Sequence, residues 1–202
     1  KMCGIYLPPV CAHLFCTQGK TVDEERLKAC LKLIRKKTGV FSNFRSAMEL
    51  AFACMLSLEE EPELALEKAL SAYDLLKKEF MSSQYLPLAA FLLKEETDMA
   101  GYIARGREIY LTMRKEHPFL TSMEDSVFAV MMAFSEKDNQ TLVEEMEACY
   151  TLLKKEFRTG NSVQTVSHVL AISGGTPAEK TGKLIELYEA LRQSGLKYSK
   201  YY

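Results

Sequence analysis

The sequence contains no tryptophan, and only 10 glycines and 6 prolines interrupt its 202 residues. An all-β chain needs many tight turns, and glycine and proline are the residues that build them, so their scarcity argues against a β-rich fold. Hydrophobic residues make up 48% of the chain, and the abundant types Leu, Ala, Glu, Lys and Met favour helices. The sequence therefore predicts an all-α protein that is long enough to bury a core.

No charge of one sign dominates, because 26 basic residues face 27 acidic ones and the net charge is −1. Such a balance gives no general reason to expect nucleic acid or an anionic membrane as the partner. The chain also lacks an apolar run as long as a membrane span. Residues 10–16 are too short and too interrupted for a signal peptide, and Pro8 and Pro9 precede them. We therefore expect a cytoplasmic protein that does not enter a membrane.

Cysteine is present but sparse, at positions 3, 11, 16, 30, 54 and 149. Cys54 and Cys149 lie in apolar helical runs, where thiols usually act as small core residues. The chain is neither short nor rich in cysteine, so a reducing compartment is simpler than a disulfide framework. Cys11, His13 and Cys16 do not have the ligand spacing of structural zinc sites. The sequence predicts neither a metal nor another cofactor.

The hexapeptide LLKKEF occurs twice, at residues 75–80 and 152–157. Similar segments precede, separate and follow these copies, with anchor residues Leu31, Tyr73, Tyr110, Tyr150 and Tyr188. The anchors are 42, 37, 40 and 38 residues apart. A period near roughly 38 residues is typical of stacked helical hairpins, because one hairpin cannot bury its apolar face alone. The repeat predicts a right-handed α-solenoid of tandem hairpins.

Each repeat is expected to combine a short apolar helix with a longer amphipathic one. The short helices are predicted at residues 47–58, 86–93, 127–134 and 163–172, and residues 64–80 show the spacing of a one-sided helix. Thr176 and Glu179 form a capping-box pattern, and Thr21, Ser122 and Asn161 also mark starts. We predict one domain, with an irregular cap at 1–20, hairpin repeats at 21–196 and a tail at 197–202.

Several motifs resemble a known family. They are KTGVFSNFR at residues 37–45, SQYLPLAA at 83–90, HPFLTS at 117–122 and GLKYSKYY at 195–202. They are similar to the bacterial domain-of-unknown-function family numbered four thousand and three, from about Thr21 to the end. The resemblance implies a bacterial cytoplasmic protein and brings no activity with it. Members of that family look longer at the C-terminal end, which implies that Tyr202 is a point of truncation.

A polar face on the last short helix is the first candidate binding site. Asn161, Gln164 and His168 are three and four residues apart, so a helix places them on one face. The corresponding parts of the earlier short helices are apolar, and a polar group on such a helix is where a repeat protein can bind a ligand. The alternative is that Asn161 and Gln164 only cap the helix and His168 is exposed at the edge of the array.

A basic rim is the second candidate. Paired cations recur at the same point of successive long helices, following Arg35 and Lys36 in the first: Lys77, Lys78, Arg114, Lys115, Lys154 and Lys155. Stacking would align them as an anion-binding row, and the alternative is that they offset helix dipoles. The tyrosine anchors likewise form either a stacking ladder for a ligand or, as we expect, packing between repeats.

No catalytic motif is present, since the chain lacks G-x-S-x-G, a phosphate loop, H-E-x-x-H and a dinucleotide fingerprint. An enzyme would have to bring His117 or His168 to Asp125 in space. We therefore expect a non-enzymatic interaction module that binds a protein or peptide. Anion or nucleic-acid binding through the basic rim is the first alternative, although we expect no nucleic-acid binding, and an undetected hydrolase is the second.

Overall fold

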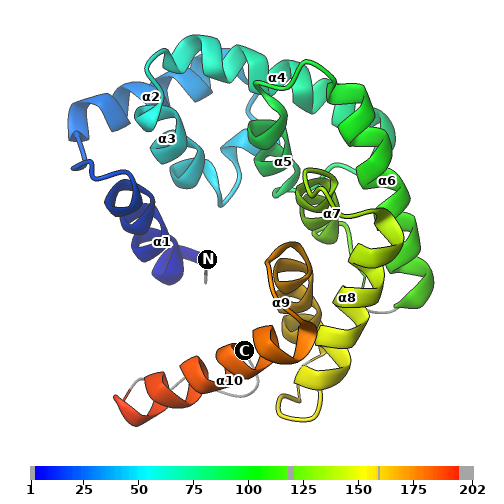
Figure 1. Ribbon diagram of the computed structural model, residues 1–202. Helices are drawn as coiled ribbons and strands as arrows, with labels where there is room; N and C mark the ends of the chain where they lie inside the picture. Colours follow the sequence, from blue (N-terminus) through cyan, green and yellow to red (C-terminus); the bar gives the residue numbers. More distant parts are fainter. Residues whose placement is uncertain (1–2, 118–120, 159, 196–202) are drawn as a thin grey trace. The chain divides into compact units, whose positions relative to one another are not determined.

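The structure, a computed structural model, describes residues 3–117, 121–158 and 160–195, and across them every regular element is a helix (Figure 1). The all-α prediction is confirmed. The elements are α1 (Cys3–Thr17), α2 (Glu24–Lys37), the 3₁₀ helix η1 (Asn43–Arg45), α3 (Glu49–Leu58), α4 (Pro62–Glu79), α5 (Leu86–Leu93), α6 (Met99–Glu116), α7 (Asp125–Ala133), α8 (Asn139–Leu153), α9 (Gly160–Ile172) and α10 (Pro177–Gln193).

Long and short helices alternate from α2 onward, as the sequence repeat predicts. The short helices α3, α5, α7 and α9 begin and end within a few residues of the expected ranges. The capping box at the start of α10 is confirmed: the Thr176 hydroxyl accepts from the Glu179 N–H, and the Glu179 carboxylate accepts from the Thr176 N–H. Local sequence signals therefore define most of these helices.

The structure differs from the sequence expectation at several helix starts, including α7, which has Glu124 and not Ser122 at its N-cap. Asp23, not Thr21, caps α2, because its carboxylate accepts from the Arg26 N–H. Asn161 lies inside α9, which begins at Gly160, and so does not cap it. Residues expected to form an irregular cap form α1 instead. Its Cys11 and Phe15 join a core cluster that also contains Ala51 and Cys54 of α3, a tertiary contact that local signals do not reveal.

The chain divides into two compact units, Lys1–Ala100 and Gly101–Tyr202, and the division falls inside α6. In unit 1, α2 packs against α3, α4 packs against α5, and α1 packs against α3. Its aromatic side chains form a connected core: the Phe44 ring lies 5.4 Å from Phe52 and 5.3 Å from Tyr73, and Phe52 stacks on Phe91 at 5.9 Å. Edge-to-face and stacked pairs of this kind add to the burial of apolar area.

In unit 2, α9 packs against α7 and α8, and α10 packs against α8 and α9. Leu142, Met146 and Cys149 of α8 are fully buried on one side of that helix. Gly106 of α6 lies against Val130 of α7, and a Cβ atom at Gly106 would come within 3.2 Å of the Val130 backbone. The absence of a side chain at this position therefore permits the close approach of α6 to α7.

Candidate functional site

Three large apolar side chains are exposed on two neighbouring loops of unit 1. Phe41 is 101% exposed and Val40 is 71% exposed, and both follow α2; Met81, which is 70% exposed, follows α4. We call Val40, Phe41 and Met81 the loop patch. Contact between water and the apolar area of these side chains is unfavourable in free energy. Clusters of exposed apolar side chains mark interaction sites.

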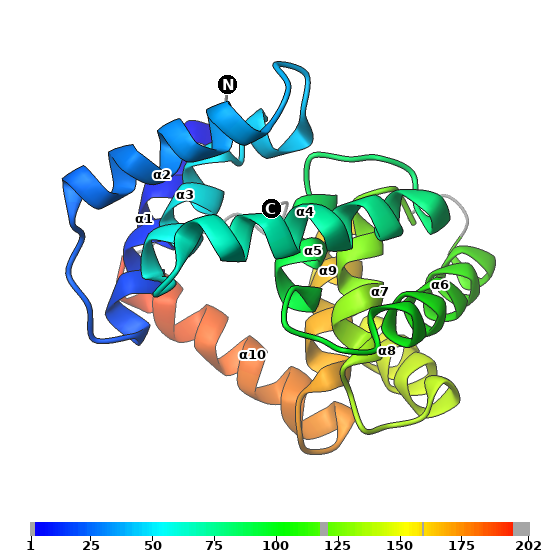
Figure 2. The same cartoon turned by 90° about the horizontal axis from the view of Figure 1, so that it is seen from above.

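Hydrogen bonds join the two loops that carry the loop patch. The Asn43 side-chain amide donates to the Tyr73 hydroxyl at 2.9 Å and to Ser82 Oγ at 2.8 Å. The Tyr73 hydroxyl and Ser82 Oγ are also 2.8 Å apart. Phe44, next to Asn43, is buried edge-to-face against the Tyr73 ring. Figure 2 shows the loops after α2 and α4 side by side. These hydrogen bonds therefore hold the two loops that carry the loop patch in fixed positions.

Cations flank the loop patch in the chain. Lys36 and Lys78 are exposed, and the charge of Lys36 helps to lower the pKa of Glu63, after the larger effect of Lys37. Lys77 is partly neutralised by Asp74, with Nζ and Oδ1 2.7 Å apart. Glu79 is the exposed acidic residue next to Lys78. With Glu63 and Glu67 against Lys37, these lysines are matched by carboxylates of the same two helix regions.

The basic rim of the sequence prediction lies at helix C-termini, divided between the two units. Lys77 and Lys78 occupy the last turn of α4, and Arg114 and Lys115 occupy the last turn of α6. Lys154 and Lys155 follow the end of α8, and Lys154 Nζ donates to the Arg158 carbonyl at 3.0 Å. All six are exposed. Cations at these ends stabilise the helix dipole, which is the alternative that the sequence left open.

The predicted polar face of α9 is divided by burial. Asn161 is exposed, whereas Gln164 is 2% exposed and His168 is 1% exposed. The Gln164 amide donates to Thr121 Oγ1 at 3.1 Å, which ties α9 to the chain before α7. The alternative reading, in which His168 is exposed at an edge, is wrong, because His168 is 1% exposed and α9 packs against α7 and α8.

His168 and Asp125, the pair that an enzyme would require, do converge. Nδ1 of His168 lies 3.6 Å from Oδ1 of Asp125, while Oδ2 of Asp125 accepts from the Ser122 N–H at 2.7 Å. His117 instead contacts Glu147, with Nε2 2.8 Å from Oε1. Among the residues that the structure describes, neither ring nitrogen of His168 has a hydrogen-bond partner. Both side chains are buried, and no nucleophilic hydroxyl of the described residues is bonded to the imidazole.

Burial controls the protonation of this pair. Desolvation lowers the pKa of His168 to about 4, and the nearby His117 adds a smaller lowering. Desolvation also raises the pKa of Asp125, and hydrogen bonds from Ser122 oppose that rise. Both shifts favour the neutral form of a buried group. A neutral imidazole therefore faces the Asp125 carboxyl group near neutral pH.

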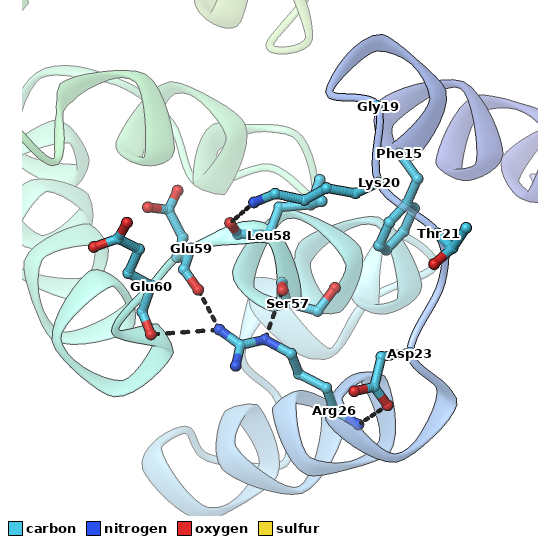
Figure 3. Close-up of a pocket in the computed structure, with 10 residues that line it drawn as sticks. All are labelled: Phe15, Gly19, Lys20, Thr21, Asp23, Arg26, Ser57, Leu58, Glu59 and Glu60. Atoms are coloured by element: carbon cyan, nitrogen blue, oxygen red, sulfur yellow. Dashed lines mark hydrogen bonds between the residues drawn. The ribbon is translucent and has the colours of Figure 1, made fainter.

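A cavity of about 500 Å³ in unit 1 lies between the ends of α1, α2 and α3 (Figure 3). Lys20 Nζ donates to the Leu58 carbonyl at 3.0 Å, and Arg26 Nε donates to the Ser57 carbonyl at 2.8 Å. Arg26 Nη2 also donates to the Glu59 carbonyl. Lys20 and Arg26 thus satisfy carbonyls at the C-terminus of α3. An anion that entered the cavity would have to compete with these carbonyl groups for the two cations.

A second cavity, of about 370 Å³, lies in unit 2 between the end of α9 and α10. Its buried Lys180 donates to the Leu170 carbonyl at 2.9 Å and the Ser173 carbonyl at 3.1 Å, and it pairs with Glu145. Lys137 pairs with the same Glu145 carboxylate at 2.9 Å. Burial would raise the pKa of Glu145, but the hydrogen bonds from the two lysines outweigh it and lower the pKa. Lys180 therefore satisfies carbonyls at the C-terminal end of α9.

In the residues that the structure describes, no three His, Cys, Asp or Glu side chains are grouped as metal ligands. In the same residues, no helix combines the length and the apolar character that a bilayer crossing requires.

A family model described as "Protein of unknown function (DUF4003)" matches residues 5–202. The chain belongs to this family. It is also 26% identical over 189 residues to the "Uncharacterized protein YeaA" of Bacillus subtilis (strain 168), and the match covers 89% of this chain. The chain spans only 57% of the length of that relative. No solved structure matches it. The resemblance found in the sequence motifs is therefore confirmed, and it is a likeness among bacterial proteins.

Proposed function

We propose that this family member is a cytoplasmic interaction module, a right-handed α-solenoid of hairpins of roughly 38 residues, that binds a protein or peptide through the loop patch. The fully exposed Phe41 beside Val40 and Met81 carries this proposal. Binding energy at interfaces concentrates in a few large side chains that become fully desolvated, and aromatic residues are prominent among them.

The hydrogen-bonded loops add a second argument. Asn43, Tyr73 and Ser82 hold the backbone on which the loop patch stands. A preordered surface loses less conformational entropy when a partner binds, so more of the contact energy is available for affinity. The alternation of long and short helices with anchors at equivalent positions supports the solenoid. A scattering radius of gyration equal to that of a compact sphere of this mass would contradict it.

Site-specific photo-cross-linking in the cell of origin tests the proposed site. A benzophenone amino acid replaces Phe41 in one variant and Leu111 of unit 2 in the other. Leu111 is a matched control because it is also a large, exposed apolar residue, on a helix instead of a loop. We expect a discrete adduct from position 41 that is absent from position 111, and mass spectrometry identifies the cross-linked protein.

The identified protein must then bind the purified chain directly. We expect Val40→Ser with Met81→Ser to weaken that binding by at least tenfold while the melting temperature stays within 2–3 °C, because both side chains are exposed. Equal adduct formation from positions 41 and 111, or unchanged binding of the double variant, would exclude the loop patch as the binding site.

The approach of His168 to Asp125 favours a hydrolase as the second candidate function. This function requires α7 and α9 to separate, because the pair is buried in the structure. A panel of chromogenic ester, amide and phosphate substrates tests it. Turnover that is lost in His168→Gln and retained in His13→Gln, which changes an exposed histidine, would favour the hydrolase.

A further inference from the structure

The long helix α10 exposes leucines at positions that the preceding long helices bury. Leu187 lies one residue before the repeat anchor Tyr188 and is 55% exposed. In the four preceding long helices the residue at this position is at most 2% exposed: Cys30, Ala72, Ile109 and Cys149. Leu184 and Leu191 are three and four residues from Leu187, so they share its side of α10, and both are half-buried. We call Leu184, Leu187 and Leu191 the α10 face.

In the preceding repeats the matching face meets the next short helix. The counterpart of Leu184 in α6 is Gly106, where a Cβ atom would come within 3.2 Å of the Val130 backbone of α7. The counterparts of Leu191 are at most 1% exposed: Ile34, Leu76, Met113 and Leu153. Each of α2, α4 and α8 packs against the short helix that follows it. The α10 face is therefore the side on which a long helix of this chain carries a short apolar helix.

The surroundings of the α10 face favour an apolar occupant. Leu184 and Leu187 line the cavity of about 370 Å³ together with Leu170 of α9. Exposed charges of both signs, Lys183 and Glu186, lie beside these leucines in the sequence, so no charge of one sign marks the surface. The outer face of a helical repeat that stays in water is usually polar. Leucines at these positions indicate instead a surface that becomes covered.

We propose that the α10 face binds a short apolar helix of a partner protein, in the position that α7 takes on α6 and α9 takes on α8. The surface lies in unit 2, so the proposal is independent of the loop patch. A helix in an apolar groove contacts it through residues three, four and seven apart. In the described part of the chain, α3, α5, α7 and α9 are already packed against other helices, so a second copy has no free short helix to offer.

Photo-cross-linking in the cell of origin tests the site and the source of the helix. A benzophenone amino acid replaces Leu187, and in the control it replaces Leu111, another exposed leucine on a long helix of unit 2. We expect an adduct from position 187 only, to a segment of a different protein with apolar residues at helical spacing. A cross-link within this chain, to a second copy or to a segment without that spacing would overturn the proposal. Equal adducts from both positions, or none, would overturn it too.

A fluorescein-labelled synthetic peptide of the cross-linked segment is then titrated by anisotropy against the full chain. We expect Leu187→Gln to weaken binding by about tenfold or more and Leu111→Gln to change it by less than about twofold. Both variants should keep the wild-type circular dichroism spectrum and melting temperature, because both side chains are exposed. Val40→Ser with Met81→Ser should leave this binding unchanged, which separates the α10 face from the loop patch. Equal losses in the two leucine variants, or unchanged binding of Leu187→Gln, would overturn the proposal.

Discussion

Tyr73 joins the core of unit 1 to its loop edge. Its ring packs edge-to-face on Phe44 and is 8% exposed, while its hydroxyl meets Asn43 and Ser82. The tyrosine anchors of the repeat were expected to put the ring in the core and the hydroxyl at the edge. Tyr73 and Tyr110 confirm this, since both are 8% exposed and the Tyr110 hydroxyl donates to the Ser122 carbonyl at 3.2 Å. Tyr150 and Tyr188 do not, because both are only half-buried.

Two substitutions of Tyr73 separate the contribution of its hydrogen bonds from that of its ring packing. We expect Tyr73→Phe to lower the free energy of unfolding by about 1 kcal/mol, because only hydrogen bonds are lost. Tyr73→Ala should lower it by roughly 2–4 kcal/mol, because a cavity opens beside Phe44. Urea denaturation measures both changes. Equal effects of the two substitutions would contradict the core position of the ring.

His168 is a buried base with no hydrogen-bond partner in the described part of the chain, and its folded-state pKa of about 4 lies below the ordinary value of 6.5. The native state therefore binds fewer protons than the unfolded state between these values. Stability from His168 is present above pH 6.5 and is lost as the pH falls towards 4. The raised pKa of Asp125 acts in the opposite sense, because the native state then binds more protons than the unfolded state.

Comparison of the wild type with His168→Gln isolates the histidine contribution. From pH 8 to pH 5 the wild type should lose about 2 kcal/mol more unfolding free energy than the variant does. Denaturant titrations at both pH values measure this difference. His13→Gln, which changes an exposed histidine, is the control and should keep the wild-type pH dependence. A His168→Gln variant as acid-sensitive as the wild type would refute the buried neutral imidazole.

At the scale of the helix, a cationic side chain completes the C-terminus of most short helices. Arg26 of α2 bonds carbonyls at the end of α3, and Arg105 of α6 bonds those after α7. Lys68 of α4 differs, because it pairs with the side-chain carboxylate of Glu95, just beyond α5, and not with a carbonyl. Each lies five residues before its repeat anchor. At the fourth such position Glu145 occurs instead. It pairs with Lys137 and Lys180, which bond carbonyls in the last turn of α9.

Arg105 should be the most sensitive of these caps. Its guanidinium donates to the carbonyls of Ala133 and Ser135 at 3.0 and 2.7 Å and to Asn139 at 2.9 Å. We expect Arg105→Met to lower the melting temperature, with a loss of about 1.5–3 kcal/mol, because those carbonyls lose a charged donor. Arg114→Met, at an exposed position, should stay within 0.5 kcal/mol. Similar melting temperatures for the two variants would argue against the cap.

For the whole molecule, the near balance of 26 basic and 27 acidic residues limits what the basic rim can do. The rim residues lie at helix C-termini, where dipole compensation accounts for them. Acidic residues within the same helices reduce the potential that a polyanion would meet, and salt screens what remains.

We accordingly expect no nucleic-acid binding that persists at physiological salt. Anisotropy titrations with single-stranded and duplex DNA and RNA at low and physiological salt measure it. The variant with Lys77, Lys78, Lys154 and Lys155 changed to Gln is the comparison. Binding that withstands physiological salt and disappears in this variant would instead support nucleic-acid recognition, because each neutralised phosphate contributes through counterion release.

Helix content, the alternation of long and short helices and the capping box at Thr176 followed from the sequence, because local propensity and apolar spacing act over a few residues. The family also followed from local motifs. The cap on α2 was misplaced at Thr21, since several polar residues near a start can accept from the first N–H groups and only the backbone path selects one.

Tertiary structure alone decided which side chains became buried or exposed in the candidate sites. His168 and Asp125 are far apart in sequence, and their approach depends on how α9 packs on α7. Residues 40, 41 and 81 occur in segments that look like ordinary loops, and their exposure depends on where Asn43 and Ser82 fix the chain. Periodicity assigns a residue to one face of an element, but the neighbouring element determines whether that face meets protein or water.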